Sequence, residues 1–135
     1  MTIELHRVAN EPLAQTLQIR EHTLLTDASV EEDGNDAGPS PHDLYDAALA
    51  SCKAITVMWY ARKKGIPVDD IHTVVEHDAS QERAGIYKLS VKLRIKGAFT
   101  AAQLTELEAV AAKCPVHKLM TKVSTEVTTV VEAMV

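Results

Sequence analysis

Short runs of alternating apolar and polar residues predict three strands in the first third of the chain. Ile3 and Leu5 alternate with polar neighbours, Leu17 and Ile19 do the same, and a third run covers residues 22–27. Alternation over a few residues is typical of a strand with one buried face. An asparagine and a proline between the first two runs favour a turn, so we predict a small meander followed by an acidic loop over residues 28–40.

A long helix is predicted to begin at Pro41 and to end near Arg62. Ser40 is a suitable N-cap and Asp43 places an acid in the first turn. The run of basic residues before Gly65 is typical of a helix C-terminus. Lys53 is the only charged residue between positions 47 and 61. A helix this apolar is expected to be buried on nearly every side.

The second half of the chain mixes strands and helices. A strict period of two from Tyr87 to Lys96 predicts a half-exposed strand, and Thr100 with Gln103 forms a capping-box pattern that predicts a helix reaching about Lys113. Further elements are expected as a strand at 71–76, a short helix at 115–122 and a final strand at 127–135. Partly segregated strands and helices predict the α+β class.

The size of the chain suits one domain over residues 1–135 and suggests a homodimer. The chain has 135 residues, of which 46% are hydrophobic and 24% charged, as in a globular protein. A helix of about 22 residues is about 33 Å long. One domain of this size hardly covers such a helix, so we expect a second copy of the chain to help bury it.

Charge and hydropathy argue against two classes of partner. The net charge is −5, which disfavours nucleic acid and anionic membranes. The basic side chains of the strand at 88–96 have no interleaved aromatic residues on their face and are expected to be solvated. No apolar run approaches the roughly 20 residues of a membrane span, and the start of the chain lacks a signal-peptide pattern. We therefore expect a cytoplasmic protein.

The chain has two cysteines, Cys52 and Cys114, which carry most of the functional question. Two thiols do not make a disulfide scaffold, so they are packed core thiols, metal ligands or a redox pair. Cys52 lies midway along the long helix, where a packed thiol is common. Cys114 precedes Pro115 and is expected at the N-cap of the short helix, where backbone N–H groups favour a thiolate.

Two histidines could share a site with these cysteines. One lies close to Cys114 in the sequence, and the other lies at the start of the long helix. His117 follows Cys114 with a Cys-x-x-His spacing, and with Cys52 and His42 it could complete a zinc site, although only one close ligand pair exists. A solvated His117 is the simpler interpretation. His42 precedes Cys52 by ten residues, or about 15 Å along a helix, so the two meet only if His42 comes from another copy.

Two motifs together resemble those of the OsmC/Ohr family of thiol-dependent peroxidases. Residues 38–52, Gly-Pro-Ser-Pro-His-Asp-Leu-Tyr-Asp-Ala-Ala-Leu-Ala-Ser-Cys, are similar to the family's opening of its central helix. Residues 114–117, Cys-Pro-Val-His, are similar to its Cys-Pro turn. The order of the predicted elements agrees along essentially the whole chain.

The resemblance implies a fold and a chemistry. It implies an intertwined α+β homodimer with long central helices buried between curved antiparallel sheets, and active sites at the dimer interface. It implies that Cys52 attacks an organic hydroperoxide and becomes a sulfenic acid, that Cys114 resolves it as a disulfide, and that a small thiol or lipoyl protein supplies the reducing dithiol. Neither a cofactor nor a metal is implied, and the activity belongs to the oxidative stress response.

One position departs from the family pattern. The family carries a glutamate directly after the proline, where this chain has His42, and that glutamate partners an arginine from the N-terminal strands. Arg20 is the best candidate for this arginine, with Arg7 as the second choice. The alternative is a non-enzymatic member of the family that binds a small apolar ligand or senses redox state.

Overall fold

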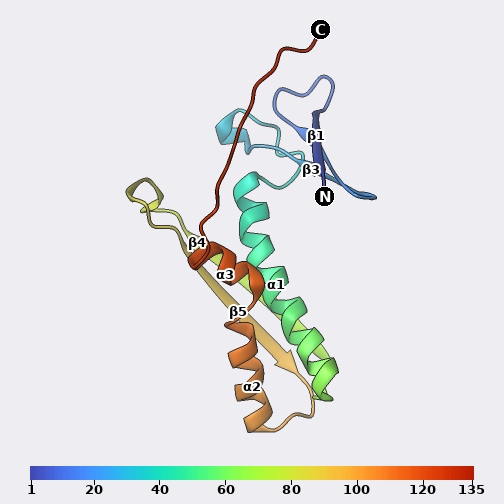
Figure 1. The fold of residues 1–135 in the computed structure, drawn as a ribbon, viewed down its shortest axis with the longest axis vertical. Coiled ribbons are helices and arrows are strands. Elements are labelled where there is room, and N and C mark those ends of the chain that lie inside the picture. Colours follow the sequence, from blue (N-terminus) through green and yellow to red (C-terminus); the bar gives the residue numbers. More distant parts are fainter. The chain divides into compact units, whose positions relative to one another are not determined.

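The computed structural model describes residues 1–135 (Figure 1), which form two compact units. The first unit comprises Met1–Ala48 and Val75–Ser90, and the second comprises Leu49–Val74 and Val91–Val135. The elements along the chain are β1 (Ile3–Arg7), β2 (Gln15–Ile19), β3 (His22–Thr26), α1 (Pro41–Lys64), β4 (Asp70–Asp78), β5 (Lys88–Lys96), α2 (Ala101–Ala111) and α3 (Pro115–Thr121), with short 3-10 turns at Val30–Glu32 and Glu82–Ala84. The predicted mixture of strands and helices is confirmed, and none of the helices is long and apolar enough to cross a membrane.

The first unit contains the predicted meander. Strands β1, β2 and β3 form an antiparallel sheet in that order, with Leu17 of β2 paired to Leu5 on one side and to Leu24 on the other. The pair Ile19–His22 closes a two-residue loop at Arg20 and Glu21. Arg20 has a φ of 53°, a left-handed conformation that the tight hairpin turn requires.

A buried carboxylate organises the acidic loop that follows β3. The side chain of Asp27 is 4% exposed and accepts hydrogen bonds from the backbone N–H groups of Ala28, Asn35 and Ala37 at 2.8, 3.1 and 3.0 Å. The hydrogen bond from Ala37 is the largest of the effects that hold the pKa of Asp27 below its usual value of 3.8. The loop is therefore tied to the end of the sheet by one charged group.

Replacing Asp27 with alanine is expected to destabilise the protein in a pH-dependent way. Because the folded state lowers the pKa of Asp27, its contribution to the free energy of unfolding is fully present above the unfolded value of 3.8 and is lost as the pH falls through the lower folded value. Urea unfolding of the native protein and of Asp27→Ala at several pH values measures this difference. Glu31→Ala, in the same loop but exposed, is the control, and an equal loss at Glu31 would contradict the assignment.

The ends of helix α1 follow the sequence signals. At the start, Asp43 N–H donates to Ser40 Oγ at 3.1 Å and Ser40 N–H donates to Asp43 Oδ2 at 2.9 Å, which is a reciprocal cap. At the end, Gly65 has a φ of 68°, and Ile66 N–H donates to Ala61 O at 2.9 Å. This pattern is a Schellman motif, which explains why the helix stops at this glycine.

The core of the second unit joins α1 to α2. Val57, Ala61 and Leu107 are at most 2% exposed and cluster with Ile66, and Tyr60, Val68, Ile71, Leu93, Ile95, Phe99 and Ala111 pack around them. The capping box of Thr100 and Gln103, predicted from the sequence, starts α2 and directs Leu107 into this cluster. These contacts join α1 to α2 within the second unit. Helix α3 follows α2 along the chain and belongs to the same unit (Figure 1).

The prediction that α1 is buried on nearly every side is wrong for the single chain. Within the second unit, the helix buries a stripe of residues spaced three and four apart, namely Leu49, Lys53, Val57 and Ala61. Ile55 and Trp59 face away from this stripe and are 68% and 60% exposed. The physical reason is that the second unit covers only one face of the helix, so the other apolar face has no cover within it.

The predicted strand at 127–135 is also wrong for the single chain. Residues 123–135 have no regular structure, and the side chains of Val127, Val130, Val131 and Met134 are at least 75% exposed. An alternating apolar pattern becomes a strand only when a neighbouring strand accepts its backbone hydrogen bonds. The chain offers no such partner to this segment.

Candidate thiol site

Both cysteines lie in the second unit and contact the first turn of α3. Val116 N–H donates to Cys52 Sγ at 3.5 Å, and His117 N–H donates to Cys114 Sγ at 3.4 Å. Cys114 is the N-cap of α3 and Pro115 occupies its first turn, as predicted from the sequence. Two sulfurs that are distant in the sequence therefore share one short stretch of backbone.

The two thiols differ in exposure. Cys114 is completely buried, whereas Cys52 is partly exposed. Only the more accessible sulfur can meet a substrate without rearrangement, and the buried sulfur is protected from oxidants that diffuse freely. Cys52 is therefore the thiol that a small molecule reaches first.

Burial, more than any other effect, raises the pKa of Cys114. The backbone N–H of His117 and the charge of Lys53 act in the opposite direction, while a hydrogen bond with the Cys52 thiol raises the pKa further. The predicted N-cap hydrogen bond is present and acts to lower the pKa of Cys114. Desolvation raises this pKa and has the larger effect. Burial therefore favours the neutral form of the Cys114 thiol.

Lys53 is a cation beside the thiols, and the sequence did not predict that it belongs to this site. Its Nζ lies 2.7 Å from Ala111 O and 3.0 Å from His117 Nδ1. An ammonium can only donate, so both atoms are acceptors. His117 is partly buried by this contact and is not the solvated residue expected from the sequence. The available signal was the position of Lys53 as the single charge in an otherwise apolar helix segment.

One hollow in the second unit is lined by Lys53. This Lys53 hollow has a volume of about 460 Å³, and neither cysteine is among its lining residues. It is mostly apolar, with charged groups at three positions. Its lining residues are Lys53, Val91, Lys92, Leu93, Ile95, Leu104, Leu107, Glu108, Ala111 and Ala112. It could receive the apolar part of a small molecule.

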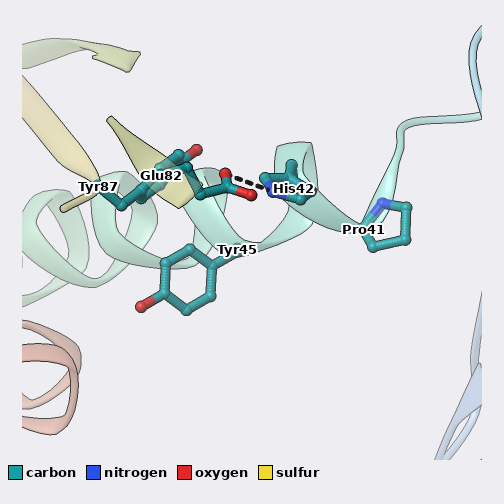
Figure 2. Close-up of a pocket in the computed structure, with 5 residues that line it drawn as sticks. All are labelled: Pro41, His42, Tyr45, Glu82 and Tyr87. Atoms are coloured by element: carbon teal, nitrogen blue, oxygen red, sulfur yellow. Dashed lines mark hydrogen bonds and ion pairs between the residues drawn. The ribbon is translucent and has the colours of Figure 1, made fainter. Parts of the chain in front are cut away.

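The predicted site residue His42 lies in the first unit and contacts a carboxylate. Figure 2 shows the imidazole of His42 at the start of α1 facing Glu82, and the Nε2–Oε1 distance is 2.9 Å. Together with Pro41, Tyr45 and Tyr87, these two residues line an open hollow of about 410 Å³. Although position 42 holds a histidine, a carboxylate from another segment therefore lies beside the helix start.

Next to this hollow, Asp46 is buried and doubly hydrogen-bonded. Its carboxylate accepts the Tyr87 hydroxyl at 2.6 Å and lies 2.6 Å from His77 Nδ1. Burial, followed by the hydrogen bond to Asp46, raises the pKa of Tyr87. These contacts join α1 to β4 and to the residue preceding β5 within the first unit.

The candidate arginines also lie in the first unit. Arg20 occupies the β2–β3 turn, and its guanidinium contacts Met1 Sδ at 3.6 Å. Arg7 donates to Glu11 O at 2.9 Å. The structure thus brings Cys52 and Cys114 together in one unit and places Arg20 and His42 in the other. It contains no group of three or more histidine, cysteine, aspartate or glutamate side chains arranged to hold a metal ion.

Comparison with known proteins adds a family and a fold. The family model described as OsmC-like protein matches residues 33–130. No curated protein matches the sequence.

Similar solved structures cover most of the chain. An OsmC like protein from Mycoplasma pneumoniae is 20% identical, covering 91% of this chain and 89% of that chain, with a TM-score of 0.68. An organic hydroperoxide resistance protein OsmC from Legionella pneumophila is 21% identical over 90% and 88%, with a TM-score of 0.63. The organic hydroperoxide resistance protein OhrB of Bacillus subtilis is 19% identical over 90% and 92%, with a TM-score of 0.58. At these identities the likeness shows a shared fold.

Proposed function

Because the chain belongs to the OsmC-like protein family, we propose that it is a thiol-dependent peroxidase that reduces organic hydroperoxides to alcohols. Proteins of the same fold from Legionella pneumophila and Bacillus subtilis are named for organic hydroperoxide resistance. The proposed activity serves the oxidative stress response and uses Cys52 and Cys114 without a cofactor.

The convergence of the two sulfurs on α3 is the observation that carries this proposal. Each sulfur accepts a backbone N–H, from Val116 for Cys52 and from His117 for Cys114. A hydrogen bond donated to sulfur stabilises the thiolate over the thiol. One partly exposed and one buried thiol in contact form the pair that a two-cysteine peroxidase needs.

The first chemical step belongs to Cys52. Its thiolate attacks the terminal oxygen of the hydroperoxide, the O–O bond breaks, and the alkoxide takes a proton to become the alcohol. Cys52 gains the oxygen as a sulfenic acid. The apolar wall of the Lys53 hollow offers a place for the alkyl group of the substrate, and Lys53 contacts His117 next to the thiols.

The second step belongs to Cys114. Its sulfur attacks the sulfur of the Cys52 sulfenic acid, water leaves, and a Cys52–Cys114 disulfide forms. An external dithiol then reduces the disulfide by exchange, returning both thiols. The buried position of Cys114 protects it from direct oxidation until Cys52 has reacted.

We further propose that a homodimer is the functional form and that the cytoplasm, where thiols stay reduced, is its compartment. Ile55 and Trp59 form an exposed apolar face on α1 that a second copy would cover. In this form, each chain would be one functional domain over residues 1–135. His42 and Arg20 would then assist a thiol of the second copy.

A stoichiometric oxidation tests the proposal. Reduced protein treated with one equivalent of cumene hydroperoxide is expected to yield one equivalent of the alcohol. The protein is expected to lose two hydrogens in mass, with a Cys52–Cys114 cross-link in its peptides. Alcohol production without any change at Cys52, or no reaction at all, would overturn the peroxidase assignment.

The second candidate function is the binding of a small apolar ligand, favoured by the Lys53 hollow. Its wall includes Val91, Leu93, Leu104 and Leu107. A non-enzymatic binder would retain ligand affinity when both cysteines are replaced by serine. Failure of the oxidation experiment combined with retained binding would favour this alternative.

A further inference from the structure

We propose that Lys53 is a positioning residue for Cys114, and that it holds Cys114 as a thiolate once Cys52 has been oxidised. This inference deepens the proposed peroxidase function and rests on it. It concerns the resolving step, for which a buried thiol must ionise at the right moment.

The first observation is a buried cation without a carboxylate partner. Lys53 is only 7% exposed. The two ion pairs of the structure join His42 to Glu82 and His77 to Asp46, and neither includes Lys53. Its ammonium contacts only neutral acceptors, Ala111 O and His117 Nδ1. Glu108 lines the same hollow but makes no ion pair with Lys53. A buried charge is costly unless an opposite charge pairs with it, so this position favours a further anion in its surroundings.

The second observation is the short connection from Lys53 to Cys114. His117 accepts from Lys53 through its ring at 3.0 Å and donates to Cys114 Sγ through its backbone N–H at 3.4 Å. One residue therefore holds the cation and the sulfur in a fixed relation. The charge of Lys53 accordingly acts to lower the pKa of Cys114.

A negative charge on Cys52 opposes the ionisation of Cys114. A negative Cys52 raises the pKa of Cys114, so one cation does not support two thiolates at once. Oxidation of Cys52 to a sulfenic acid removes that negative charge. The charge of Lys53 continues to act on Cys114, so the ionisation of Cys114 becomes more favourable when there is a sulfenic acid to attack.

The step balances without a further reactant. Cys114 loses its proton, its sulfur forms a bond to Cys52 Sγ, and the S–O bond of the sulfenic acid breaks. The departing hydroxide takes up a proton equal to the one that Cys114 lost, and water leaves. Lys53 remains an ammonium throughout, so it positions charge and is not consumed.

The other charged and titratable groups around Lys53 define the controls. Cys52 lies on α1, His117 on α3, and Glu108 of α2 and Lys92 of β5 line the same hollow. Lys92 is exposed, whereas Lys53 is buried. Lys92→Met therefore removes a charge of the same sign from the same hollow without removing a buried one.

The test is a pH titration of Cys114 by the ultraviolet absorbance of its thiolate. In a Cys52→Ser background Cys114 is the only thiol, and a variant lacking both cysteines supplies the tyrosine baseline. Lys53→Met is expected to raise the pKa of Cys114 by about one unit, which is about tenfold less thiolate at a fixed pH below it. Lys53→Arg is expected to keep the native value, and Lys92→Met to leave it unchanged.

An unchanged pKa of Cys114 in Lys53→Met would overturn the inference, as would an equal shift in Lys92→Met. If Lys53→Met does not fold, Lys53→Gln, which retains a donor for Ala111 O, takes its place in the same comparison. No hydroperoxide is present in the titration, so its result stands apart from the turnover that tests the peroxidase function. If the pKa of Cys114 shifts but the protein does not turn over hydroperoxide, the effect of Lys53 on Cys114 is supported and the peroxidase function is rejected.

Discussion

Replacing Cys52 with serine is expected to reduce hydroperoxide turnover on the order of a thousandfold or more. A serine hydroxyl is not ionised near neutral pH and is a poor nucleophile toward peroxide oxygen. The hydrogen bond from Val116 N–H, at 3.5 Å in the native protein, stabilises a thiolate that serine does not provide. Consumption of tert-butyl hydroperoxide with a dithiol reductant measures the loss.

Cys114→Ser is the matched variant, because it leaves Cys52 and its contact with Val116 in place. We expect this variant to consume about one equivalent of hydroperoxide and then to stall, since the sulfenic acid has no resolving thiol. Excess hydroperoxide should then add a second oxygen to Cys52, which mass spectrometry detects as a sulfinic acid. Equal turnover in the native protein and Cys52→Ser would eliminate the peroxidase assignment.

Leu107→Ala is expected to lower the free energy of unfolding by about 2–5 kcal/mol. Leu107 is completely buried and joins α2 to Val57 and Ala61 of α1. Truncation removes apolar contacts and leaves a cavity that the rigid helix pair fills only in part. Urea unfolding followed by circular dichroism measures the change.

Leu104→Ala is the control for this prediction. Leu104 is on the same helix and has the same side chain but is 45% exposed. Its truncation is expected to cost far less, since less apolar surface returns to water. Similar losses for the two variants would indicate that α2 does not pack through Leu107 as described.

The elements that could be predicted from the sequence are those specified by local chemistry. Ser40 with Asp43, Thr100 with Gln103, and Gly65 mark helix ends through hydrogen bonds within a few residues, and the structure contains all three. The alternating pattern from Leu89 to Ile95 likewise matches β5. Such signals need no knowledge of the rest of the fold.

The predictions that failed concern segments whose structure depends on residues far away in the sequence. The apolar pattern at 127–135 is a suitable strand sequence, yet a strand needs an edge with which to pair. The apolar character of α1 indicated burial, yet Ile55 and Trp59 are exposed because the second unit covers a single face of the helix. Sequence patterns record suitability for burial, and packing decides whether cover is present.

The sequence by itself determined the family, through residues 38–52 and 114–117, and it predicted Cys52 and Cys114 as the chemical pair. Only the tertiary structure decided that both sulfurs contact the first turn of α3 and that Lys53 and His117 accompany them. The physical reason is that the sequence shows one charge in an apolar helix but does not show which distant atoms this charge contacts after folding. Those acceptors, Ala111 O and His117 Nδ1, come from segments that folding brings to Lys53.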